Sequence, residues 1–407
     1  MKGWDMRWRR WFARGLIGLG LIVLAWGVGR FYTAAWTGFA PKVLWDWLEL
    51  LLIPAVLTGG GIWFTRSENR QAREIEERRL IENRRIEEER LKEARAIEEK
   101  RLEETRAIEH DRAQDATVKD YLDQMTELLL TRGLRTSLQS EEVRSVARAR
   151  TLLVLRSIDR ERKSTIVQFL YESGLIGYRG MKENVCAIID IGGGSLERVS
   201  LRGALLDGAS FEEVNLESAN LSGAQLGGAN LGEARLFQAH LSNAYLAEAQ
   251  LIGTNLEEAH LYRVDFEDAD LSRAYLIKAN LSKACLLGAN LRRTDLYEAQ
   301  LNDANLTLSD LSEANLIGAN LIRANLTGAN LSWASLKWAC LSGAHLKEAQ
   351  LCGATCDYAN LTNCNCVTLD QLLQAQSLHG AILPNHIDPA DLGDKWSPPE
   401  DKTKSEP

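Results

Sequence analysis

The sequence predicts an all-β solenoid that follows two transmembrane helices, a charged helical stalk and a small α-helical module. Three observations lead to this fold class. Positions 196–366 follow a five-residue period, positions 66–112 follow an eleven-residue period, and positions 1–64 hold two apolar runs and eight of the eleven tryptophans. A chain of 407 residues is long enough for several domains, and a net charge of -8 does not by itself imply a polyanionic partner.

Two apolar runs predict a transmembrane hairpin over residues 15–64. The first, "GLIGLGLIVLAWGVG", is uncharged and continues to Trp36, which gives about the 20 residues that a span needs. The second, Leu44 to Phe64, includes Asp46 and Glu49 near its start and Pro54 in its core. A cleaved signal peptide is the alternative, but the second run follows soon and no clear cleavage site lies between.

The distribution of basic residues predicts the orientation of this hairpin. Lys and Arg are concentrated in residues 1–14 and directly after the second run, whereas the connecting loop has few. Because positive charge marks cytoplasmic loops, both termini are expected to be cytoplasmic. The protein is then an integral protein of a cell inner membrane or thylakoid, with the lipid bilayer as a partner.

Residues 65–114 predict a charged helical stalk. Isoleucine recurs every eleven residues from Ile75 and leucine from Leu80, and Glu–Arg pairs such as Glu76–Arg79 recur three residues apart. Such pairs each add roughly 0.2–0.5 kcal/mol to an exposed helix, and a period of 3.67 residues per turn favours a nearly straight rod or a right-handed supercoil. A solvated single helix and a self-associating coiled coil both remain open. Residues 115–180 then show three amphipathic patterns and predict an α-helical module.

The stretch "DIGGGS", residues 190–195, resembles the first phosphate-binding motif of actin-like ATPases. That fold also needs a second phosphate loop and a second lobe, and the chain provides neither. The three glycines are therefore interpreted as a flexible lead-in to the solenoid.

From Leu196 to Cys366, one position in every five is apolar. The steps give (366 − 196)/5 + 1 = 35 positions, of which 31 are Leu, and Ala stands two residues earlier in 27 of the 35. Neither an α-helix nor a flat strand has this period, whereas a chain that turns by about 90° every five residues closes a four-sided coil. Leu then fills the interior, and Ala fits where the walls approach.

Stretches such as "ANLIGANLIRANLTGANL" identify this region as similar to the pentapeptide-repeat family, whose motif is A-(D/N)-L-x-x. The resemblance extends from Leu196 to Cys366 and implies a right-handed quadrilateral β-helix with four repeats per coil. Similar combinations with membrane spans are familiar from cyanobacteria. The expected organisation is as follows: 1–14 basic N-terminus, 15–64 hairpin, 65–114 stalk, 115–180 helical module, 186–366 β-helix, 367–383 cap helix and 384–407 disordered tail.

Cysteines near the end of the repeat raise the question of a metal site. Cys356, Cys364 and Cys366 fall on expected inward positions, where a small apolar side chain is needed, so they are interpreted as core residues. No catalytic, cofactor-binding or metal-ligating constellation is predicted anywhere in the chain.

The sequence therefore favours a non-enzymatic, membrane-anchored scaffold that presents the solenoid for protein–protein interaction on the cytoplasmic side. A membrane transport or channel-associated component is one alternative. A topoisomerase-binding DNA mimic is a lesser one, because 20 acidic against 12 basic residues in 196–366 is a mild excess. The partners are an unknown protein and, as an open alternative, a second copy through the stalk or the solenoid; no nucleic acid is expected.

One face of the solenoid is the candidate interaction surface. Residues four repeats apart stack on one side, and the side that begins at Leu196 gathers large apolar residues. Its candidates are Phe237, Tyr275, Ile277, Tyr297, Ile317, Trp338 and Tyr358. Exposed apolar patches of this kind often serve binding, although a stabilising ladder between neighbouring coils is the alternative.

Overall fold

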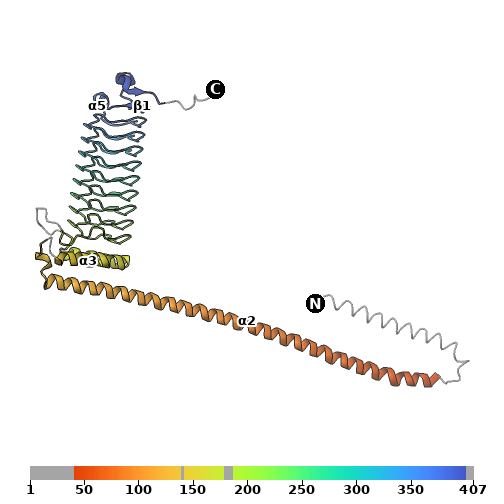
Figure 1. The fold of residues 1–407 in the computed structure, drawn as a ribbon. Coiled ribbons are helices and arrows are strands. Elements are labelled where there is room, and N and C mark those ends of the chain that lie inside the picture. Colours follow the sequence, from red (N-terminus) through yellow and green to blue (C-terminus); the bar gives the residue numbers. More distant parts are fainter. Residues whose placement is uncertain (1–40, 139–141, 178–186, 400–407) are drawn as a thin grey trace. The chain divides into compact units, whose positions relative to one another are not determined.

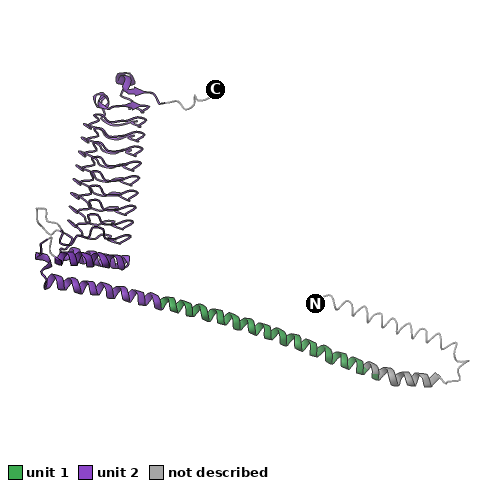
Figure 2. Ribbon diagram, viewed as in Figure 1, with its two compact units in different colours: residues 1–104 green, residues 105–407 purple. Residues whose placement is uncertain are grey.

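A computed structural model describes residues 41–138, 142–177 and 187–399 (Figure 1). Contacts divide the chain into two compact units, residues 1–104 and 105–407 (Figure 2). The first contains most of the helix α2. The second contains the end of α2, the helices α3 and α4, the stacked coils of the solenoid, and a terminal cap.

Helix α2 runs from Pro41 to Leu130 and includes the expected stalk. The expectation of a transmembrane hairpin is corrected here: within the described residues, no helix offers a stretch long and apolar enough to cross a membrane. The expected first span, residues 15–36, lies outside those residues. The second apolar run, which holds Asp46 and Glu49, is the start of α2, and that helix continues without a break into the charged sequence. The predicted integral-membrane localisation with cytoplasmic termini is corrected with it.

The solenoid is built from four-sided coils, with one repeat on each side. Parallel bridges join residues four repeats apart, from Ser195 with Asn215 through to His345 with Asn365. The continuous strands of an all-β fold are absent from the described part of the chain, where the two named strands have two residues each. The reason is the short side of each coil: the chain reaches the next corner almost at once, so each side pairs through a single bridge.

Each corner is a hydrogen-bonded turn whose third residue is left-handed. At the first full repeat, the Val199 amide donates to the Leu196 carbonyl at 3.2 Å, and Arg198 has φ of 56°. An Asn or Asp before the central Leu completes the corner: Asn215 Oδ1 accepts from the Glu217 amide at 3.1 Å. This Asx turn is the physical reason for the polar residue in the motif.

The interior of the solenoid is a column of Leu and Ala with almost no exposed surface. The central Leu side chains and the preceding Ala side chains are buried from coil to coil, and two coils accommodate Phe211 and Phe266 in place of Leu. The polar exceptions bond to the backbone; for example, Thr254 Oγ1 donates to the Leu231 carbonyl at 2.7 Å. Because no buried side-chain nitrogen or oxygen of the described residues lacks a partner, the interior offers no polar site.

The helices α3, Glu142–Ser157, and α4, Arg160–Glu172, cover the first coil. Arg148 of α3 donates to the carbonyls of Asp190 and Gly192 at 3.0 and 3.1 Å, and the Ser210 amide donates to the Ile176 carbonyl. The "GGGS" glycines are themselves a corner of the solenoid: Gly193 is left-handed with φ of 72°. The stretch is therefore a hydrogen-bonded first corner rather than a flexible lead-in.

A cap closes the opposite end of the solenoid, and the five-residue period does not predict it. Helix α5, Leu369–Gln374, lengthens its coil by two positions, so Thr355 pairs with Ser377 instead of the residue four repeats further on. The sequence "SLHGAIL", 377–383, then continues the repeat with Leu378 buried, and Gln371 Nε2 donates to the buried carbonyls of Leu346 and Ala349. The expected cap helix is thus confined to the α5 insertion.

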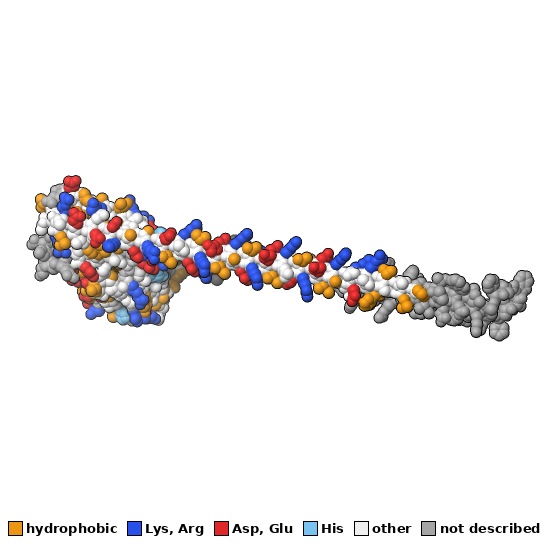
Figure 3. All heavy atoms as spheres, turned by 90° about the horizontal axis from the view of Figure 1, so that it is seen from below, with side chains coloured by type: hydrophobic (Ala, Val, Ile, Leu, Met, Phe, Trp, Pro, Cys, Tyr) orange, Lys and Arg blue, Asp and Glu red, His pale blue; other side chains and the backbone are white. Residues whose placement is uncertain are grey.

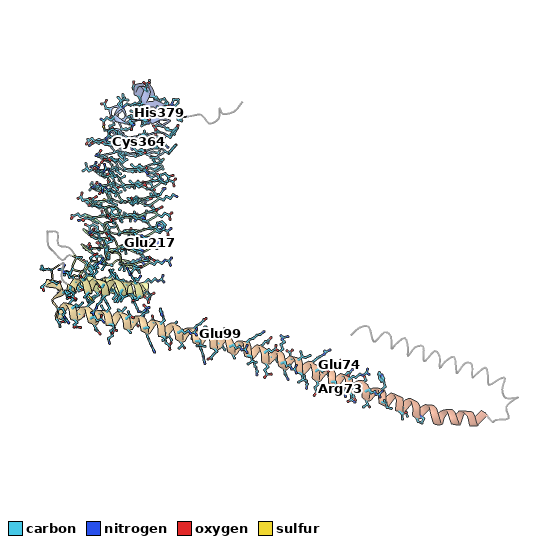
Figure 4. All side chains as sticks on the ribbon, in the orientation of Figure 1. Arg73, Glu74, Glu99, Glu217, Cys364 and His379 are labelled. Carbon is cyan, nitrogen blue, oxygen red and sulfur yellow. The ribbon has the colours of Figure 1, made fainter. Side chains whose placement is uncertain are left out.

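Residues expected to be disordered complete this cap. The 3-10 helix η2, Pro389–Lys395, leads into β2, Trp396–Ser397, which pairs in parallel with β1, Leu378–His379. Trp396 Nε1 donates to the Ala381 carbonyl at 2.9 Å. In Figure 4, Glu217 marks the coils near one end of the solenoid, and Cys364 and His379 mark the other.

A cluster of ion pairs around Arg162 joins α4 to the end of α2. The Arg162 guanidinium contacts Asp111 at 2.6 Å and Asp115 at 2.7 Å, and it also pairs with Asp159, the N-cap of α4. The backbone amide of Arg162, followed by its guanidinium, stabilises the Asp159 carboxylate and lowers its pKa below the ordinary 3.8. Because the pKa of Asp159 is lower in the folded protein than in the unfolded chain, the stabilisation is fully present above pH 3.8. It is lost as the pH falls through the pKa that Asp159 has in the folded protein.

We therefore expect α4 to become less stable below about pH 4, the range in which a free carboxyl group is protonated. The variant Asp159→Asn tests this expectation. Asparagine keeps the N-cap bond but has no carboxyl to protonate. We expect amide-exchange protection of residues 160–172 to fall with decreasing pH in the unmodified chain and to fall less steeply in the variant, when both are compared at each pH. Parallel curves would show that protonation of Asp159 does not control this helix.

Candidate protein-interaction face

The candidate residues all belong to one side of the four-sided coil, here called the 196 face. It comprises the residue before each central Leu in the series that starts at Leu196, together with the two corner residues that follow. Tyr275 precedes Leu276 at the middle of the side, and Ile277 is the first residue of the next corner. Trp338 and Tyr358 are the left-handed corner residues of later coils on the same side.

The seven candidates fall into two groups by exposure. Phe237, Ile277 and Ile317 are half-buried. The tryptophan and the three tyrosines stand further out: Trp338 is 61% exposed, Tyr275 51%, Tyr358 40% and Tyr297 37%. Phe237 and the two isoleucines thus fit a ladder between coils, whereas the tryptophan and the tyrosines present much of their surface to solvent.

Trp338 and Tyr358 form a stacked pair along the corner. Their ring centroids lie 5.8 Å apart with an interplanar angle of 11°. Tyr358 in turn lies over Gly380, where an added Cβ would come within 2.5 Å of the ring. A left-handed conformation is unusual for bulky residues, and the glycine of the next coil gives the aromatic ring the room that it needs.

The sequence interpretation missed Trp333, which borders the same face. It is 64% exposed and left-handed, and it occupies the corner immediately before the side that contains Ser335. Its ring lies over Gly353, where an added Cβ would come within 2.6 Å. The signal was available: Trp333 precedes Trp338 by one period of five, so the two tryptophans flank one side of one coil.

Acidic residues outnumber basic ones on the 196 face, and ion pairs link neighbouring coils there. Arg235 pairs with Glu217, Lys278 lies 3.9 Å from Glu298, and Lys337 lies 3.5 Å from Asp357. A hydrogen bond to Glu298 raises the pKa of Tyr297 above its usual value, so its hydroxyl stays protonated at neutral pH. Exposed pairs of this kind contribute little to stability, and they leave the aromatic rings in a surface of mixed polarity.

The remaining exposed apolar residues of the solenoid are scattered over other sides. Tyr245 is 42% exposed on the side opposite the 196 face, and Leu308 projects from a corner of that opposite side, over Gly328. Single exposed apolar residues are normal on protein surfaces. The concentration of four exposed aromatic residues and Trp333 distinguishes the 196 face.

Two of the three cysteines expected in the core lie there. Cys356 and Cys364 are buried, and burial raises the pKa of both thiols to about 12. Such thiols do not ionise at neutral pH, and the thiolate is the form that binds metals. Cys366 is exposed instead, because the chain leaves the five-residue frame there and Val367 takes the buried position. Among the residues that the structure describes, no cluster of His, Cys, Asp and Glu could hold a metal ion.

Stacked four-sided coils, Asx corners and a Leu–Ala interior define the class of protein, and comparison with known families agrees. The profile of pentapeptide repeats matches eight copies between residues 195 and 365. The chain belongs to the pentapeptide-repeat family.

Several solved structures are similar to the chain. HetL, a pentapeptide-repeat protein involved in heterocyst differentiation regulation from the cyanobacterium Nostoc, is 37% identical, with 48% of this chain and 85% of HetL covered and a TM-score of 0.32. Trypsin-treated QnrB1, a plasmid-mediated fluoroquinolone resistance protein, is 21% identical over 43% of this chain and 88% of its own, with a TM-score of 0.30.

A pentapeptide-repeat protein of the Arabidopsis thaliana thylakoid lumen is 29% identical, covering 30% of this chain and 72% of its own, with a TM-score of 0.14. Among curated proteins, none matches the chain.

Proposed function

We propose that this chain is a non-enzymatic protein whose solenoid binds a protein partner through the 196 face, extended to Trp333. The observation that carries the proposal is the concentration of exposed aromatic rings on one of four otherwise similar sides. Tryptophan and tyrosine dominate the energetic centres of protein interfaces, because they bury large rigid surfaces at low entropic cost.

A purely structural role explains the half-buried members of the face better than the exposed ones. Phe237, Ile277 and Ile317 are half-buried. Trp333 and Trp338 are each more than 60% exposed, so stacking between coils leaves most of their surface in solvent. Large exposed aromatic rings that gather on one surface are typical of interaction sites.

Replacement of both tryptophans by asparagine tests this proposal. Asparagine accepts the left-handed conformation, so Trp333→Asn with Trp338→Asn is expected to leave the thermal melt unchanged while partner affinity falls at least tenfold. The matched control is Tyr245→Asn on the opposite side, at a position where asparagine is the commonest residue of the repeat. The measurement is affinity capture by the full chain, followed by titration of the captured protein against all three forms.

Equal titration curves for the tryptophan variant and the unmodified chain would reject the 196 face as the binding surface. Equal losses in both variants would point to a general change in the solenoid rather than to the two tryptophans.

A further inference from the structure

The first unit contains a second apolar surface, on the stalk segment of α2, residues 72–104. Six aliphatic side chains of this segment are between 41% and 57% exposed. They are Ile75, Leu80, Ile86, Leu91, Ile97 and Leu102. Figure 3 shows apolar side chains recurring between charged ones along this helix. A solvated helix has no need of aliphatic residues at fixed intervals.

The eleven-residue period places these residues in one sector. Eleven residues make three turns, so successive residues lie about 98° apart, and the Ile column and the Leu column are about 130° apart around the axis. Midway between them runs a column of smaller side chains, Ala72, Asn83 and Ala94. Small residues at the centre of a helix face allow a second helix to approach closely, with Ile and Leu closing the two edges.

The charged columns are arranged as opposites about this central line. Between the small column and the Ile column lies a column of Arg only, and between the small column and the Leu column lies a column of Glu only. The two columns are Arg79, Arg90, Arg101 and Glu76, Glu87, Glu98. A second Arg column lies just outside the Leu column and comprises Arg73, Arg84 and Arg95. A second Glu column lies just outside the Ile column and comprises Glu82, Glu93 and Glu104.

This arrangement is complementary to a second copy of itself in one orientation. Two parallel helices related by a two-fold axis along their length place the left half of one face against the right half of the other. Each Arg column then meets a Glu column, and the Ile column meets the Leu column. In such a pair, Arg79 of one copy and Glu76 of the other are separated by about 4.5 Å along the helix axis, a distance that their side chains can span. An antiparallel pair would instead set Arg against Arg and Glu against Glu.

We propose that the stalk, residues 72–104, is a parallel, in-register homodimerisation surface. Its sole occupant is a second copy of this chain, selected by the opposed Arg and Glu columns. The proposal goes beyond the solenoid's protein-binding role and does not rest on it, because no residue of the 196 face takes part. Pairing provides two copies of that face per assembly, which raises the avidity for a multivalent partner.

Ion pairs within a single helix are the competing explanation for the charged columns. Intrahelical pairing accounts for Glu and Arg three residues apart. It does not account for the repetition of the Ile, Leu and small-residue columns at the same eleven-residue interval along the segment. An ion pair that the helix does make, Arg85 with Glu89 at 3.3 Å, lies on the opposite side of the helix from that sector.

The first experiment measures the mass of the full chain by light scattering across a concentration series. The unmodified chain is expected to have the mass of a dimer, and Ile86→Lys with Ile97→Lys is expected to halve it. Lysine is a good helix former, so circular dichroism should be unchanged. The matched control is Ile81→Lys: Ile81 is 67% exposed but lies nearly opposite the central line, and its substitution should leave the dimer intact.

A monomeric mass for the unmodified chain at every concentration would overturn the proposal. A dimer that persists in the double lysine variant would overturn it as well, because the association would then use another surface.

The second experiment tests orientation by exchanging the two inner charged columns. The swapped chain carries six substitutions: R79E, R90E, R101E, E76R, E87R and E98R. Parallel pairing predicts that the swapped chain still dimerises with itself but forms no hybrid with a size-tagged unmodified chain, since Glu would face Glu and Arg would face Arg. Hybrids in excess of homodimers after mixing would show antiparallel pairing and refute the proposed orientation.

Discussion

A chain that ends at Leu383 is expected to lose about 3–6 kcal/mol of unfolding free energy and to self-associate. The removed segment contains the buried Ile387 and Leu392, each worth about 1.5–3 kcal/mol, and the strand β2, which covers β1. Without β2, the last coil presents unpaired backbone groups at its edge, and such edges pair with other chains. Denaturant titration and light scattering measure the two effects.

The matched control is a chain that ends at Pro399, which keeps η2, β2 and the Trp396 bond to Ala381. This control is expected to behave like the full chain in both measurements. If the chain that ends at Leu383 matched it, the cap would not be required to close the solenoid.

Leu281→Ala is expected to destabilise the middle of the solenoid by about 2–5 kcal/mol, the range for a buried Leu whose cavity cannot collapse. Leu281 has no exposed surface and lies between coils on both sides, so its neighbours are held by their own hydrogen-bonded corners. Chemical denaturation of the full chain, followed by circular dichroism, measures the loss.

The comparison is Glu267→Ala at an exposed corner, where the change should stay within about 0.5 kcal/mol. Because the corner amide of Glu267 is held by Asp265 Oδ1 at 3.1 Å, removal of the side chain leaves the turn intact. Similar losses for the two variants would mean that the five-residue register does not define the interior.

Much of the candidate face could be predicted from the repeat. A coil of four repeats places Trp338 and Tyr358 in one column, and the structure stacks their rings. The repeat could not separate exposed from half-covered members, because Tyr275 and Ile277 occupy neighbouring positions and their exposure depends on side chains of adjacent coils. Residues four repeats apart do not indicate Trp333, because it lies at the corner that precedes the side and so stands outside the columns of the 196 face.

Composition alone misled the interpretation near the N-terminus. The apolar run from Leu44 to Phe64 matches a span in length, but a span is recognised by the mean hydropathy of a window of about 19 residues, and this run contains Asp46, Glu49 and the glycines 59–61. In the structure this run is continuous with a highly charged helix, and the described part of the chain contains no helix that could cross a bilayer.

The sequence by itself determined the interior of the solenoid, because a five-residue side admits only one inward register for Leu and Ala. Tertiary structure alone decided how the two ends close. At the first coil, α3 and α4 supply donors to carbonyls that no neighbouring coil reaches, as Arg148 does for Asp190 and Gly192. At the last coil, the insertion of α5 shifts the frame, so Cys366 turns outward and Leu378 resumes the core. A repeat specifies the contacts between neighbouring coils, but a terminal coil has a neighbour on one side only. Its unpaired backbone groups must form hydrogen bonds with the segment that folds against them.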